Sequence, residues 1–207
     1  MTILDLPALE ATPLAHEPYD HLIVPGFIRA ASRDGVTRDF PAIRKAGLFP
    51  LPALRYSGDF ARVIDELDSA ELERILAVKL GVKLNGLPKL FTVRGRCALK
   101  DGKIHTDSLD KVLTVLLYLN SQWEADGGRL RVLRSATDLS NYAAEIPPAA
   151  GTLFVFRRSE RSYHGHESFA GERRAIQVNW MTDRSSRDRE LARHRLSARI
   201  KQLVPFA

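Results

Sequence analysis

His105 and Asp107 are the residues of this sequence best suited to chemistry, because they stand two positions apart with Thr106 between them. In an extended strand, side chains two apart point to the same face, so the imidazole and the carboxylate can reach one ion together. A histidine much later in the chain, His164 or His166, can complete the set. Two histidines and one carboxylate on one face of an octahedral metal leave positions open for a co-substrate and oxygen, which is typical of non-heme Fe(II) oxygenase sites.

Short strands separated by glycine and proline must position these side chains. Residues 90–99 alternate weakly and end at a Lys-Asp-Gly-Lys turn that delivers His105. Three further β-type runs follow at residues 111–118, 130–133 and 151–156, and Asp126-Gly-Gly predicts a hairpin turn into the second of them. We interpret residues 135–148 as a polar excursion that borders the mouth of the site.

The order of these segments resembles a known family. The stretches HTD, LLYLNSQW, GGRLRVL, GTLFVF and HGHESFAGERRAIQVNW follow one another between residues 87 and 183. Together they resemble the prolyl-hydroxylase-like branch of the Fe(II)/2-oxoglutarate-dependent dioxygenases. The resemblance implies a mainly β fold with supporting helices, a double-stranded β-helix or jelly roll whose N-terminal helices pack on one sheet.

The resemblance also assigns the metal ligands. It implies that His105, Asp107 and His164 bind Fe(II), because the family places its second ligand histidine before a small residue and nine to ten positions before a cationic anchor. His164 precedes Gly165 and stands nine positions before Arg173. His166 stays a candidate for supporting the metal site or contacting the substrate.

Arg173 is the expected anchor for 2-oxoglutarate. Strand alternation places it on a small and polar face with Ala175, Gln177 and Asn179, whereas Arg174 shares the opposite face with bulky apolar residues. A planar guanidinium can grip a carboxylate with two hydrogen bonds. By the resemblance, the hydroxyl of Tyr118 helps to hold the same carboxylate.

Several other polar residues are candidates for contact with the substrate. Arg94 and Arg96 are expected to share one face of their strand with Thr92, and that face is either inward or an ion-paired edge. Further candidates are Arg161, Arg174 and Asn179.

The N-terminal part supplies the predicted supporting helices. Apolar residues spaced three and four apart follow Ser57 and Ser69, and Gly81 ends the second run, so two helices are expected between residues 57 and 81. Residues 30–52 lack clear periodicity and predict a loop with one short helix over residues 42–47.

Length and composition favour a single domain. The chain has 207 residues, of which 44% are hydrophobic, enough for one full core. We divide it into an arm with supporting helices (1–86), a catalytic double-stranded β-helix (87–183) and a basic C-terminal helix (184–207). That last segment carries much of the net charge of +6, but no nucleic-acid motif accompanies it, so nucleic acid is not an expected partner.

The sequence predicts a cytoplasmic protein. It contains no apolar run of membrane-spanning length and no signal-peptide pattern. Its single cysteine, Cys97, excludes an internal disulfide and suits a reducing compartment.

The predicted activity is hydroxylation of an unactivated C–H bond, as the resemblance implies, with Fe(II) as cofactor, 2-oxoglutarate and O2 as co-substrates, ascorbate as a supporting reductant, and release of succinate and CO2. The substrate is either a small molecule or a prolyl or other residue of one protein. Two other interpretations stay open: a cupin-like metalloprotein of different chemistry, and a non-catalytic binding module on the same barrel.

Overall fold

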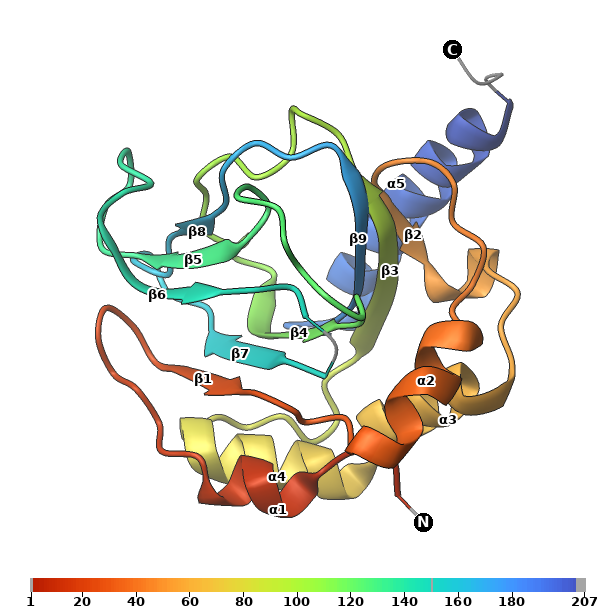
Figure 1. Ribbon diagram of the computed structural model, residues 1–207. Coiled ribbons are helices and arrows are strands. Elements are labelled where there is room, and N and C mark those ends of the chain that lie inside the picture. Colours follow the sequence, from red (N-terminus) through yellow and green to blue (C-terminus); the bar gives the residue numbers. More distant parts are fainter. Residues whose placement is uncertain (1, 150, 204–207) are drawn as a thin grey trace.

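Two antiparallel sheets form the centre of the computed structural model, which describes residues 2–149 and 151–203 (Figure 1). The six-stranded major sheet has the order β1-β7-β4-β9-β3-β2, and the three-stranded minor sheet has the order β6-β5-β8. The major strands are β1 (His21–Val24), β2 (Leu48–Pro50), β3 (Lys89–Cys97), β4 (Lys111–Tyr118), β7 (Leu153–Arg157) and β9 (Gly171–Met181). The minor strands are β5 (Leu130–Leu133), β6 (Tyr142–Ile146) and β8 (His164–Gly165).

Helices pack on one side of the major sheet, as the sequence predicts (Figure 1). They are α1 (Leu6–Ala11), α2 (Ala30–Arg38), α3 (Gly58–Leu67) and α4 (Ala70–Leu80). The two helices expected from periodicity are α3 and α4. The Ser69 side chain caps α4 by accepting from Leu72 N, and Gly81 ends it with a left-handed backbone (φ 61°). Their apolar faces join the outward side chains of the major sheet in the main core.

The prediction for residues 30–52 was wrong in detail. Residues 30–38 form α2, residues 42–47 form no helix, and the strand β2 and a short 3-10 helix, η1 (Leu51–Ala53), follow. Polar α2 buries only Gly35 and Val36, so it carries too little apolar periodicity to be recognised. Gly35 permits close packing on α3, because a Cβ there would lie 2.0 Å from an Asp59 carboxylate oxygen.

A β-bulge overturns the expectation that Arg94 and Arg96 share a face. The register of β3 against β9 shifts between these two residues, at Gly95. A Cβ on Gly95 would lie 2.7 Å from Ile43 Cβ, so the adjoining 41–47 segment requires glycine at this position. Arg94 therefore faces the inter-sheet cavity, whereas Arg96 is exposed on the outside.

The predicted hairpin at residues 126–128 was also wrong in its partner strands. This turn leads into β5, but β5 pairs with β6 and β8, while β4 pairs with β7 and β9 in the other sheet. The supposed polar excursion contains β6, which forms a hairpin with β5. Residues 135–148 are not among those that line the inter-sheet cavity, so the expected lip is absent from its described walls.

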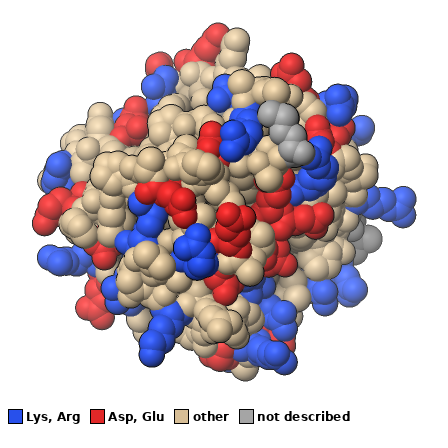
Figure 2. Space-filling view, turned by 90° about the horizontal axis from the view of Figure 1, so that it is seen from below, with Lys and Arg blue, Asp and Glu red and all other residues tan. Residues whose placement is uncertain are grey.

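The C-terminal helix α5 (Arg184–Leu203) follows β9 directly and packs against the β2 and β3 side of the molecule (Figure 1). Residues 204–207 of the expected helix lie outside the described residues. Within the described chain, no helix combines the length and apolarity needed to cross a membrane. Figure 2 shows acidic and basic side chains intermixed on the face seen from below, so the positive net charge does not produce a uniform basic field there.

Candidate metal and co-substrate site

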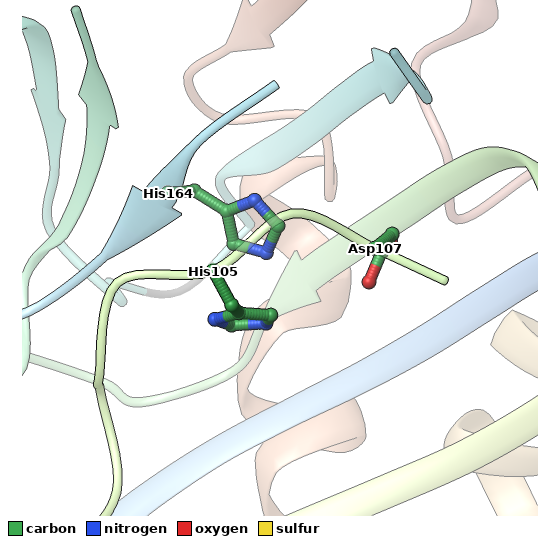
Figure 3. A group of neighbouring side chains, drawn as sticks. All are labelled: His105, Asp107 and His164. Atoms are coloured by element: carbon green, nitrogen blue, oxygen red, sulfur yellow. The ribbon is translucent and has the colours of Figure 1, made fainter. Parts of the chain in front are cut away.

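His105, Asp107 and His164 converge at one end of the cavity between the two sheets (Figure 3). One potential ligand atom from each residue lies within 4.8 Å of the others. The convergence depends on a local bridge: His105 N donates to His164 O at 3.1 Å, and His164 N donates to His105 O at 3.0 Å. Backbone pairing thus brings together two histidines that are far apart in sequence.

Backbone carbonyls fix the orientation of both imidazoles. Nδ1 of His105 lies 2.8 Å from the Lys103 carbonyl, and Nδ1 of His164 lies 3.0 Å from the Ser162 carbonyl. A carbonyl can only accept, so each Nδ1 carries a proton, and Nε2 is the atom through which each ring in its neutral form can bind a metal. Burial lowers the pKa of His164 to about 4, which keeps this imidazole neutral at pH 7. Neutral imidazoles with oriented rings are good metal ligands.

Asp107 is a buried carboxylate held in its ionised form. Burial alone would raise its pKa, but the nearby Lys111 and His164, together with hydrogen bonds from Lys111 and Thr114, lower it below its usual value. Lys111 Nζ lies 2.7 Å from Oδ1, and the Thr114 hydroxyl donates to Oδ2. Asn179 in turn donates to Thr114 Oγ1 at 2.8 Å. Two imidazoles and one ionised carboxylate form a donor set that fits Fe(II).

Arg173 and Tyr118 lie side by side in the same cavity. The Arg173 side chain is buried, and it donates from Nε to Gly128 O at 2.8 Å and from Nη2 to the Tyr118 hydroxyl at 3.3 Å. It makes no ion pair with any residue that the structure describes. A buried guanidinium without a carboxylate partner is costly, so this end of the cavity fits an anionic ligand such as 2-oxoglutarate.

One cavity of about 400 Å³ contains both groups. Arg94, His166 and Asn179 also line it, whereas Arg96 and Arg174 lie outside it on another hollow.

Arg174 points away from the cavity, donates to Thr37 O at 3.2 Å and lies over the Phe40 ring. Arg161 lies at a separate surface hollow. The strand alternation expected for β9 is therefore present, and of the arginines suggested for substrate contact only Arg94 lines this cavity.

His166 lies beside the metal group without joining it. Its Nδ1 donates to the Glu167 carbonyl at 2.8 Å, and burial lowers its pKa to about 4. Arg173 and Arg94 also lower this pKa, because both are cations close to the ring. His166 therefore lies toward the arginine end of the cavity.

Sequence reasoning missed several residues of the site. Lys111 and Thr114 donate hydrogen bonds to the Asp107 carboxylate. Their positions on the following strand, four and seven residues after Asp107, were the only sequence pattern that could have indicated this role. Glu190, Arg193 and His194 of α5 also line the cavity. No motif marked them, because which wall a terminal helix covers depends on tertiary packing.

Comparison with known proteins agrees with this geometry. Residues 97–182 match the family model described as the 2OG-Fe(II) oxygenase superfamily. These residues form a 2OG-Fe(II) oxygenase domain. The match contains the His105, Asp107 and His164 group as well as Tyr118 and Arg173. Among curated proteins, none matches the chain.

Solved structures of 2OG oxygenases share the fold. A prolyl-4-hydroxylase from Pseudomonas putida is 18% identical with a TM-score of 0.59, and the alignment covers 84% of this chain and 99% of that one. A viral collagen prolyl hydroxylase from Paramecium Bursaria Chlorella virus-1 is 14% identical with a TM-score of 0.51, over 78% and 96% of the two chains. The epimerase SnoN from nogalamycin biosynthesis is 15% identical with a TM-score of 0.54, over 86% and 82%. The double-stranded β-helix expected from the sequence is confirmed.

The chain is an enzyme with a 2OG-Fe(II) oxygenase domain over residues 97–182, and that family uses Fe(II), 2-oxoglutarate and O2. When bound, the metal and 2-oxoglutarate supply the oxidising power. The protein's own groups would bind and orient the metal and 2-oxoglutarate and would exclude water. The two sheets enclose the site between them.

Proposed function

We propose that this enzyme hydroxylates a small molecule, with Fe(II) bound by His105, Asp107 and His164 and 2-oxoglutarate anchored by Arg173 and Tyr118. One observation carries the proposal. An oriented group of two histidines and one carboxylate shares a cavity with a buried arginine that has no ion-pair partner in the described chain. A rival cupin-like chemistry gives no reason for that arginine.

The size of the cavity supports a small substrate. Its volume of about 400 Å³ lies toward the lower end of small-molecule sites, which range over about 300–1,000 Å³. The residues that were expected to form a lip for a protein segment line no part of it. The prolyl hydroxylases among the structural neighbours make a protein substrate the alternative to test.

We infer that the whole chain works as one catalytic unit in the cytoplasm. A single cysteine suits a reducing compartment, in which Fe(II) is also kept reduced. The three parts proposed from the sequence then have separate tasks: the N-terminal part supports the major sheet, residues 87–183 carry the site, and the basic helix covers one side of the cavity.

The test is 2-oxoglutarate turnover. Purified protein with Fe(II), ascorbate and 2-oxoglutarate is incubated with pooled metabolites and, separately, with lysate proteins, and succinate and mass gains of one oxygen are followed. We expect turnover stimulated by metabolites, lost in Asp107→Ala and unchanged in His16→Ala, a change at an exposed histidine that does not line the cavity. Turnover stimulated only by protein would contradict the small-molecule assignment, and absence of any turnover would contradict the oxygenase assignment.

A further inference from the structure

Helix α5 supplies a charged wall to the catalytic cavity. Glu190, Arg193 and His194 line the same 400 Å³ space as His105, Asp107 and His164. The helix is tied to the approach of β4, because Arg189 lies 3.5 Å from Asp110, which also lines the cavity. The side chain of His194 is only 13% exposed, and Lys111 contributes to lowering its pKa, so this part of the helix faces the cavity near Lys111.

Glu190 is the residue on this wall that has a carboxylate oxygen available to bind a ligand. Its Oε1 accepts from both of its partners, Arg193 Nη2 and, at 3.2 Å, His194 Nε2. Its Oε2 has no hydrogen-bond partner among the residues that the structure describes, and the Glu190 side chain, which is 24% exposed, lines the cavity. The other cavity carboxylates are engaged: Asp107 belongs to the metal group, and Asp110 pairs with Arg189.

We propose that Glu190 binds a protonated amino group of the substrate, and hence that the substrate is a small amine or free amino acid. This inference rests on the proposed small-molecule hydroxylase function. A carboxylate oxygen that is partly desolvated and lacks a partner favours a cation with N–H donors, since charge-assisted hydrogen bonds are the stronger class. Arg193 does not occupy this oxygen, and its side chain is 71% exposed, so it stays at the rim.

Helix α5 also offers a matched control. Asp188 is two positions from Glu190, its side chain is 60% exposed, it pairs with Arg187, and it does not line the cavity. Glu190→Gln preserves the shape of the side chain and an oxygen that can accept from Arg193 and His194, but it removes the charge. Asp188→Asn removes the same charge from the same helix outside the cavity.

The experiment measures succinate formation with a panel of probes: the standard free amino acids, simple alkylamines, the N-acetylated form of each, and carboxylic acids and sugars without nitrogen. We expect at least one free amine to stimulate turnover and its N-acetylated form to lose at least tenfold in kcat/KM. Glu190→Gln should lose at least tenfold in kcat/KM for that amine, mainly through a higher KM, while it keeps the wild-type metal content and melting temperature. Asp188→Asn should behave as wild type.

Stimulation only by compounds without an amine or by proteins, no stimulation by any member of the amine panel, or wild-type kcat/KM in Glu190→Gln would each overturn the assignment. A loss of metal or of melting temperature in Glu190→Gln equal to its loss of activity would also overturn it, because the role would then be structural. Failure of the underlying oxygenase function is distinguishable, since it would give no 2-oxoglutarate turnover with any probe and no metal binding by the wild-type protein.

Discussion

Arg173 and Arg174 are neighbours in sequence with opposite environments, and this contrast yields a direct test of the anchor. Arg173 is buried without an ion pair in the described chain, whereas Arg174 pairs with Glu172 and lies over Phe40 on the outside. Arg173→Leu should weaken 2-oxoglutarate binding by about 2–5 kcal/mol, the cost of losing a buried charged hydrogen-bond partner. Arg174→Leu should change it by less than about 1 kcal/mol. Calorimetry with Mn(II)-loaded protein checks both, and the reverse order would move the anchor to Arg174.

The two histidines near the metal group also differ in a measurable way. His164 directs Nε2 toward the group, whereas His166 lies outside it at the arginine end. His164→Ala should therefore abolish stoichiometric Mn(II) or Fe(II) binding, and His166→Ala should retain it. Metal analysis after gel filtration measures the metal content of both variants. Metal retained by His164→Ala but lost by His166→Ala would assign the ligand to His166.

Two buried neutral histidines make the stability of the metal-free protein depend on pH. Burial lowers the pKa values of His164 and His166 to about 4, whereas the unfolded chain has ordinary values near 6.5. Between these values the unfolded state binds more protons, so the free energy of unfolding must fall as the pH falls from 6.5 toward 4. We expect a loss of about 2 kcal/mol for each histidine between pH 7 and pH 5.

Urea unfolding of metal-free protein at the two pH values measures this loss. His166→Asn should remove a large part of the pH dependence, because it removes one of the two histidines whose pKa burial lowers to about 4. Equal stability of the wild-type protein at pH 7 and pH 5 would show that the histidines are not buried as neutral groups.

At the scale of elements, α4 separates buried from exposed apolar side chains within one turn. Leu76 is fully buried in the main core, and Val78 is 73% exposed on the same helix. Leu76→Ala should lower the free energy of unfolding by about 2–5 kcal/mol, since it removes buried methyl groups and leaves a cavity. Val78→Ala should change it by about 0.5 kcal/mol or less. Chemical denaturation of both variants tests whether α4 supports the sheet through this face, and similar losses would contradict it.

Elements with a local signal could be predicted from the sequence, and those that depend on distant partners could not. Capping by Ser69, termination at Gly81 and apolar spacing made α4 recognisable, and alternation along β9 separated Arg173 from Arg174. The assignment of β4 and β5 to different sheets leaves no trace in either strand, because it is decided by β7, β8 and β9. The bulge at Gly95 depends on the packing of Ile43, and the inward wall of α5 depends on where the helix docks.

At the scale of the whole molecule, metal binding should raise thermal stability. The ion would bind the folded protein, in which His105, Asp107 and His164 converge, and not the unfolded chain, in which His164 is far from the other two. With Mn(II) at 100 times its Kd, the expected gain is about 2.7 kcal/mol. Differential scanning calorimetry with and without Mn(II) measures it, and Asp107→Ala serves as the control. An equal shift in that variant would mean that the stabilising ion binds elsewhere.

The backbone bridge between His105 and His164 gives the metal a topological role. The segment between these histidines contains β4, β5, β6 and β7, which belong to both sheets. An ion bound to both histidines would cross-link the chain as a disulfide does, and a loop of about sixty residues closed in this way is worth about 4 kcal/mol of chain entropy. A chain with one cysteine cannot form that link with sulfur. The ion would therefore act as a reversible cross-link. A catalytically competent, metal-loaded enzyme would then be one in which the four strands between His105 and His164 have already folded.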